Sequence, residues 1–319
     1  MTRRSPGAQP PDEAAAAPAN ASAADGAAAM RWLLLATMAV WGLNLSVVKL
    51  LIERFEPMLV AVLRMAVAAI AISAVLWWRR LPWPRFTPRE LGLVAVCAVL
   101  MVYLNQFLFT EGVARTAATN AALIIALNPL VSALVAALLL GDRLTPRRLA
   151  GVALGFGGVA LVVLSKSGAA LVHGGIGDAL VLGSVASWVL GGALVRGLAA
   201  GRDSASVSWA VHGTGTLMLL ADLLLLRSLP LGGLARFSLA DAGLLVLSGV
   251  FATGIGALVW NRALVTLGVA RTALYVYWVP IFGVAFGVLL LGEPLTLWHL
   301  AGLAAVLAGT WLGTGGHPR

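Results

Sequence analysis

The second half of the chain repeats the first, and no other feature restricts the possible fold as strongly. Shifted by 151 residues without gaps, the stretch from Asn120 to Gly158 matches a later stretch of the sequence. Pro129 falls on Pro280, and Leu139-Leu140-Gly141-Asp142 falls on Leu290-Leu291-Gly292-Glu293. Apolar composition alone aligns leucine with leucine, but not a proline, a glycine and an acid in register. The sequence therefore predicts two related units in tandem.

The composition requires a bilayer as the solvent for most of the chain. Hydrophobic residues make up 60% of it and charged residues 11%, whereas a soluble domain carries roughly 25% charged residues. Several apolar runs are long enough to span a membrane. We therefore expect an all-α integral membrane protein of about ten transmembrane helices. The expected spans are 32–51, 58–78, 91–109, 119–140, 149–164, 178–199, 207–226, 242–260, 270–291 and 298–312.

Each repeat holds an odd number of helices, about five, so the second enters the membrane upside down. The prediction is two inverted five-helix repeats, an architecture common among secondary transporters. Two equivalent halves that exchange conformations open a protein alternately to the two sides. We expect the first repeat at residues 31–166 and the second at 175–314. Residues 1–30 are rich in Ala, Pro, Ser and Asp without apolar periodicity, and we interpret them as a disordered cytoplasmic tail.

The basic residues indicate the orientation. With the N-terminus inside, fourteen basic residues lie on the cytoplasmic side and five on the other, a bias that favours both termini in the cytoplasm. The net charge of +9 is thus explained by loops between spans and does not indicate nucleic-acid binding. Twenty arginines against two lysines are typical of a genome rich in G and C, so we expect a bacterial inner membrane.

Several short motifs resemble the EamA family of the drug/metabolite transporter superfamily, over nearly all of residues 32 to 314. The motifs are Trp41-Gly42-Leu43-Asn44, Leu63-Arg64, Asn128-Pro129, Leu140-Gly141-Asp142, Val279-Pro280 and Leu291-Gly292-Glu293-Pro294-Leu295. The resemblance implies a ten-helix carrier of small organic solutes, such as amino acids, other metabolites or toxic compounds, with a cavity between the halves. The second half departs from the pattern, because Val189, Leu190 and Gly191 follow Trp188.

Polar residues and prolines inside apolar spans are candidates for the substrate site. Pro129 and Pro280 occupy one repeat position, and each removes a backbone hydrogen bond, so we expect a matched pair of helix kinks that line the cavity. The alternative is that prolines are simply common in membrane helices. Intramembrane amides can hydrogen-bond a substrate or only join helices. The candidate amides are Asn44, Asn105, Gln106 and Asn128.

Two ionisable residues lie inside predicted spans. Arg64 is costly in hydrocarbon. It has three possible roles: attracting an anionic substrate, pairing with Glu56 or Glu111, or snorkelling to the interface. His212 has two, a proton relay or a satisfied buried histidine.

Aromatic rings can stack on a substrate or gate a cavity, although packing or an interfacial belt is the simpler role for any one ring. Tyr275 and Trp278 are favoured because they closely precede Pro280. The aromatic candidates for lining the cavity are Trp41, Tyr103, Trp188, Trp209, Trp260, Tyr275, Tyr277 and Trp278, of which Trp41, Trp188, Trp260, Tyr275 and Trp278 are assigned to the site.

Gly141 and Gly292 are expected to end helices, and the acids that follow them, Asp142 and Glu293, to lie near a helix N-terminus in a structural role. The fifth and tenth spans are rich in small residues, which permits close packing within the chain or in a homodimer.

The sequence favours a carrier that moves a small-molecule substrate by alternating access. No paired acids, metal-spaced histidines or nucleophile–base set lie in the apolar core, and no Walker motif is present. We therefore expect no catalytic residues, no metal and no cofactor. A membrane enzyme, or a receptor or scaffold that binds without transport, are the alternative functions.

Overall fold

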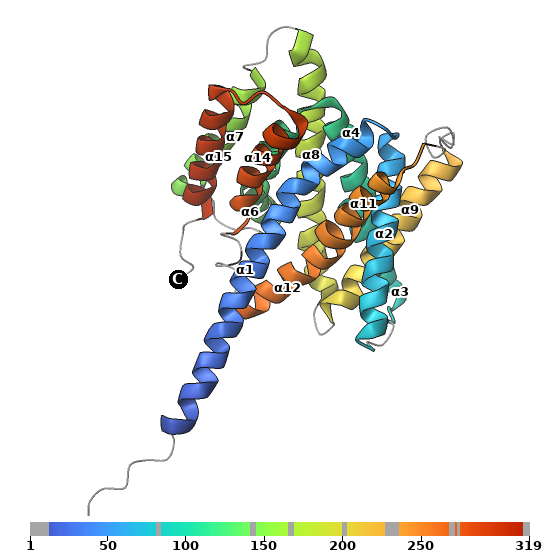
Figure 1. Ribbon diagram of the computed structural model, residues 1–319, viewed down its shortest axis with the longest axis vertical. Coiled ribbons are helices and arrows are strands. Elements are labelled where there is room, and N and C mark those ends of the chain that lie inside the picture. Colours follow the sequence, from blue (N-terminus) through green and yellow to red (C-terminus); the bar gives the residue numbers. More distant parts are fainter. Residues whose placement is uncertain are drawn as a thin grey trace, which may run out of the picture.

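The computed structural model describes residues 13–80, 84–140, 145–164, 169–199, 203–226, 236–267, 272 and 275–314. Within these ranges the chain is helical and contains no strand. The helices form one bundle, and α1 projects beyond it at the lower end (Figure 1). In chain order the elements are α1 (Glu13–Ile52), α2 (Pro57–Trp78), α3 (Pro88–Ala98), η1 (Val99–Leu104), α4 (Asn105–Arg115), α5 (Ala118–Ile125), α6 (Asn128–Leu140), α7 (Pro146–Leu164), α8 (Ala169–Ala199), α9 (Ser204–Leu225), α11 (Leu239–Val246), η2 (Leu247–Ile255), α12 (Gly256–Leu267), α14 (Trp278–Leu291) and α15 (Leu297–Thr314).

Seven helices of the described ranges are long and apolar enough to cross a membrane, and two shorter apolar helices, Trp278–Leu291 and Leu297–Leu312, follow them. The chain is therefore a multi-pass helical membrane protein, as the composition predicted. The count of ten spans and their arrangement as an inverted repeat stay predictions.

The N-terminal segment differs from the sequence-based expectation. We expected residues 1–30 to be disordered, but α1 begins at Glu13, so residues 13–30 are helical. The physical reason is their alanine content, because alanine has the highest helix propensity of the residues. Residues 1–12 lie outside the described part of the chain.

Helix boundaries recur at the sequence offset of 151 residues. α3 begins at Pro88 and α11 at Leu239, and η1 ends at Leu104 and η2 at Ile255. The caps recur as well, because the capping box of Thr87 and Glu90 corresponds to the capping box of Ser238 and Asp241. In Figure 1 the run from α3 to α4 rises through the bundle, whereas the run from α11 to α12 descends.

The two prolines follow helix interruptions. Residues 126–127 form a turn between α5 and α6, and residues 276–277 form a turn before α14. Pro129 is the second residue of α6 and Pro280 the third of α14. At these turns the backbone uses tighter i→i−3 hydrogen bonds, from Leu127 N to Ile124 O at 3.0 Å and from Val279 N to Val276 O at 3.1 Å. Proline causes such breaks because it has no N–H and clashes with the preceding turn.

Helices α7 and α15 pack with their backbones almost in contact. A Cβ added at Gly158 would lie 2.9 Å from Gly302 O, and one at Gly309 would lie 2.6 Å from both Gly151 O and Gly155 N. Small residues therefore set the spacing of these two helices.

We predict that Gly309→Ala lowers the free energy of unfolding by about 1–3 kcal/mol, as overpacking does. The added methyl group would meet backbone atoms, which cannot rotate away. The matched control is Gly157→Ala in α7, where nothing lies within 4 Å of the added Cβ, so we expect no loss there. Thermal unfolding of the detergent-purified variants measures both, and equal stability of the two variants would contradict the packing argument.

Candidate functional site

A chain of hydrogen bonds with Arg64 near its centre crosses the middle of the bundle. Arg64 lies in α2 and is only 2% exposed. Its Nε donates to Ser248 Oγ of η2, and its Nη1 donates to Gln106 Oε1 of α4 at 3.1 Å. Ser248 Oγ in turn donates to Asn44 Oδ1 of α1 at 2.6 Å. The guanidinium group therefore joins three other helical elements through side chains alone.

The chain continues from Gln106 to α8. Gln106 Nε2 donates to Asn105 Oδ1 at 2.9 Å, and Asn105 Nδ2 donates to the carbonyl oxygen of Ser184 at 2.8 Å. We call the connected groups of Asn44, Ser248, Arg64, Gln106, Asn105 and Ser184 the central polar chain. It contains residues from both predicted repeats.

π-Helical segments flank the central polar chain. η1 ends directly before Asn105, and η2 contains Ser248. Such segments often mark functional sites, because they insert an extra residue into a helix and change the direction in which the next side chains point. Neither segment was apparent from the apolar pattern of the sequence.

The partners of Arg64 differ from those expected. Glu56 caps α2, accepting from Leu59 N at 2.9 Å, and Glu111 pairs with Arg115 of its own helix. Of the three roles considered for Arg64, pairing with Glu56 or Glu111 does not occur among the described residues, because each acid binds a group close to it in its own helix. Among the described residues no carboxylate lies within ion-pair distance of Arg64. The ring of Phe109 lies 5.8 Å from its guanidinium carbon.

Trp41 of α1 contacts η2 and also packs against Trp260 of α12. Trp41 Nε1 donates to the carbonyl oxygen of Ala252 at 2.8 Å, and the rings of Trp41 and Trp260 are 5.7 Å apart. The indole can approach this closely because residue 256 is a glycine. A Cβ there would lie only 2.6 Å from Trp41 Nε1.

A separate pocket lies near the lower end of the bundle. It has a volume of about 390 Å³ and is lined by Ala28, Arg31, Trp32, Leu35, Tyr275 and Trp278. Two of the aromatic candidates thus lie together, but not in the central polar chain.

The remaining candidates are dispersed. Trp188 on α8 is 38% exposed. His212 is buried in α9, with Nδ1 2.9 Å from the carbonyl oxygen of Ser208. Asn128 and Pro129 are half-buried at the start of α6, whereas Pro280 is buried in α14. Within the described ranges no hydrogen bond joins any of these residues to the central polar chain.

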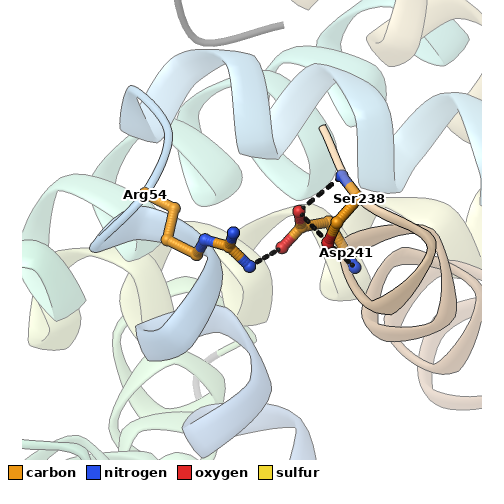
Figure 2. Close-up of polar contacts among 3 residues, drawn as sticks. All are labelled: Arg54, Ser238 and Asp241. Atoms are coloured by element: carbon orange, nitrogen blue, oxygen red, sulfur yellow. Dashed lines mark hydrogen bonds and ion pairs between the residues drawn. The ribbon is translucent and has the colours of Figure 1, made fainter. Parts of the chain in front are cut away.

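An ion pair closes the end of the bundle at which α11 begins (Figure 2). Arg54, between α1 and α2, donates to Asp241 Oδ1 at 2.5 Å. Asp241 has no accessible side-chain surface, and its other oxygen accepts from Ser238 N at 2.8 Å and Ser238 Oγ at 2.6 Å. The same carboxylate therefore caps α11 and links the two halves.

Glu293 makes a second link at this end. It follows Gly292, which ends α14 in the left-handed conformation at φ 65°. Its carboxylate accepts from the backbone N–H groups of Ala118 at 2.6 Å and Thr119 at 2.8 Å. Glu293 therefore caps a helix N-terminus, as expected, but the helix that it caps is α5 of the other half. Asp142 and Gly141 lie outside the described residues.

Two further contacts join the halves beside Glu293. Thr116 Oγ1 donates to Asp178 of α8, and Asn120 Oδ1 lies 3.2 Å from His299 Nε2 of α15. We call these contacts, together with the Arg54–Asp241 and Glu293 links, the polar closure. Nearby, Lys49 Nζ binds the carbonyl oxygens of Val113 at 2.9 Å and Thr116 at 2.8 Å, where the end of α4 leaves carbonyls unpaired.

Sequence reasoning found four members of the central polar chain but missed Ser248, because a serine in a membrane span is common. It also missed Asp241, although Ser238 three residues earlier gives the capping-box pattern.

Comparison with known proteins finds a family, relatives and a solved structure. The model of a family described as the EamA-like transporter family matches residues 29–164 and 175–314. An uncharacterized transporter of Archaeoglobus fulgidus is 28% identical over 293 residues, covering 88% of this chain and 98% of the relative. A probable terminal-alkyne amino-acid exporter of Streptantibioticus cattleyicolor is 26% identical over 290 residues, covering 88% and 92%. A solved structure with 16% identity covers 88% of this chain and 94% of its own, with a TM-score of 0.60.

We predict that Ser248→Ala lowers the free energy of unfolding by about 1–3 kcal/mol, because it leaves the buried Arg64 Nε and the half-buried Asn44 Oδ1 without their shared partner. Ser46→Ala is the matched control. Ser46 is also buried, and no described residue hydrogen-bonds its Oγ, so its loss should be neutral. Thermal unfolding in detergent compares them, and an equal effect of both substitutions would show that the chain adds no stability.

Proposed function

This chain belongs to the EamA-like transporter family, and on that premise we propose that it exports small organic metabolites, amino acids among them, by alternating access. Membership makes it a membrane transporter of small metabolites and not an enzyme, as the sequence predicted. Export and an amino-acid substrate are supported by the name of the Streptantibioticus relative.

The observation that carries the proposal is an asymmetry between the two ends of the bundle. At one end the polar closure joins the halves by four sets of contacts, among them the buried Asp241. The pocket of about 390 Å³ lies toward the opposite end. Polar contacts that hold the halves together at one end, with none between the halves beside the pocket among the described residues, support the proposal of one state of an alternating-access cycle.

The repeated caps support a second state related to the first. Asp241 has no exposed surface, whereas its equivalent Glu90 is half-buried beside an exposed Thr87. If the halves are inverted repeats, the two carboxylates lie at opposite faces of the membrane. An exchange of conformations between the halves then opens the Asp241 end and closes the Glu90 end.

We propose that the central polar chain and the Trp41–Trp260 pair form the substrate site, between the polar closure and the pocket. With both termini in the cytoplasm of a bacterial inner membrane, the pocket faces the cytoplasm. The structure then corresponds to the state that an exporter uses to load its substrate.

We predict that Trp41→Ala, Asn44→Ala and Asn105→Ala each lower transport at least about tenfold, the effect of losing roughly 1.4 kcal/mol of binding free energy. Uptake of labelled amino acids by proteoliposomes measures transport. Trp77→Ala is the control, because Trp77 is 78% exposed. Normal transport by all three site variants would exclude this site.

A second prediction concerns the polar closure. Arg54→Gln weakens a contact between the halves and should favour the state that is open at that end. Arg115→Gln is the matched control, because Arg115 pairs with Glu111 within α4. The reporter is Leu45→Cys in a Cys97→Ala background, since Leu45 is 2% exposed and lies one residue beyond Asn44.

An impermeant maleimide applied from the closure side should label this cysteine about two- to fivefold faster in Arg54→Gln, as loss of an ion pair worth up to about 1 kcal/mol implies. Arg115→Gln should leave the rate unchanged. Equal rates in all three proteins would mean that the Arg54–Asp241 pair does not hold this end closed.

A further inference from the structure

We infer that Arg64 binds the carboxylate of the transported molecule, so that the carrier selects small organic acids, amino acids included, over their neutral analogues. The inference rests on the proposed function and deepens it, because it names the chemical group that the central polar chain recognises.

Among the described residues, no group that contacts Arg64 neutralises its charge. The residue is 2% exposed, and its contacts are the hydroxyl of Ser248, the amide oxygen of Gln106 and the ring of Phe109. None of these groups carries a full negative charge. A buried charge without a counter-charge costs several kcal/mol, and an anion bound beside Arg64 would offset part of that cost.

The cations near the polar closure are treated differently. Arg54 pairs with Asp241 and Arg115 with Glu111. Lys49 binds two carbonyl oxygens at the end of α4, where the helix dipole is negative. Each of these cations is met by a negative charge or a negative helix end. Arg64 is more deeply buried than Arg54 or Arg115, yet among the described residues it meets only neutral groups.

The guanidinium also keeps donors for a ligand. It has five N–H groups, and within the described part of the chain two hydrogen bonds leave it, from Nε and Nη1. That leaves three N–H groups on the two terminal nitrogens. A carboxylate accepts two parallel hydrogen bonds from a guanidinium group, which matches the donors that remain.

The surroundings suit the rest of such a molecule. η2 carries both Ser248, which binds Arg64, and Ala252, which binds the indole of Trp41. The guanidinium and the Trp41–Trp260 pair therefore lie along one segment. A small acid with an apolar side chain can place its carboxylate on Arg64 and its hydrocarbon part against the rings.

The test compares acids with their carboxamides on the full-length protein. Binding of leucine, propargylglycine and benzoate, and of the three matching amides, is measured by thermal shift in detergent. We expect each acid that binds to do so at least about tenfold more tightly than its amide. In Arg64→Gln the acid should lose about ten- to a hundredfold in affinity, the range for a charged hydrogen-bonded pair, while the amide changes less than threefold.

Arg64→Lys should retain part of the preference for the acid. Arg115→Gln removes an arginine charge outside the central polar chain and should retain all of the preference. Equal loss of acid and amide in a folded Arg64→Gln protein would assign Arg64 a structural role and overturn the inference. If that variant does not fold, the wild-type protein decides, because the absence of any acid-over-amide preference also overturns it. Acid binding without flux in proteoliposomes would instead contradict the proposed function and leave the role of Arg64 intact.

Discussion

A positive charge buried in hydrocarbon has to be met by polar groups, and Arg64 imposes this requirement on the middle of the molecule. Ser248 and Gln106 accept hydrogen bonds from the guanidinium group, and Asn44 and Asn105 bind those two residues in turn. Because these side chains come from different helices, the charge fixes how the helices face one another. The apolar contacts around them have no such directionality, since lipid tails are as apolar as leucine. Relative helix rotation in this part of the bundle is therefore set by polar contacts.

Much of this arrangement was predictable from the sequence, because a polar residue inside a long apolar run can be recognised without knowing the fold. Asn44, Asn105, Gln106 and Arg64 were found in this way. Their partners were not, because hydrogen bonds form between residues that lie far apart in sequence. One of the three roles considered for Arg64 was an ion pair with Glu56 or Glu111, but those acids bind groups near them in their own helices.

The two π-helical segments explain why periodicity could not supply the rest. Each adds residues to a turn and so shifts the face that the following residues present. A pattern read with 3.6 residues per turn across η1 or η2 assigns the wrong face to one side of the segment. The prediction of disorder for residues 13–30 was wrong for a different reason. The wealth of alanine, serine and aspartate in residues 1–30, without apolar periodicity, suggested disorder, but alanine itself favours a helix.

The close contact of α7 and α15 has a consequence for how such a chain can arise. The approach of Gly158 to Gly302 and that of Gly309 to Gly151 are one contact repeated, because each pair maps onto the other at the offset of 151 residues. A surface that pairs with its own copy in this way is the surface of a symmetric dimer. If the halves are the inverted repeats that the sequence predicts, the chain has the geometry of two subunits fused end to end. Fusion frees each copy to change alone, which a true homodimer cannot do, and a residue such as Arg64 can then serve one half only.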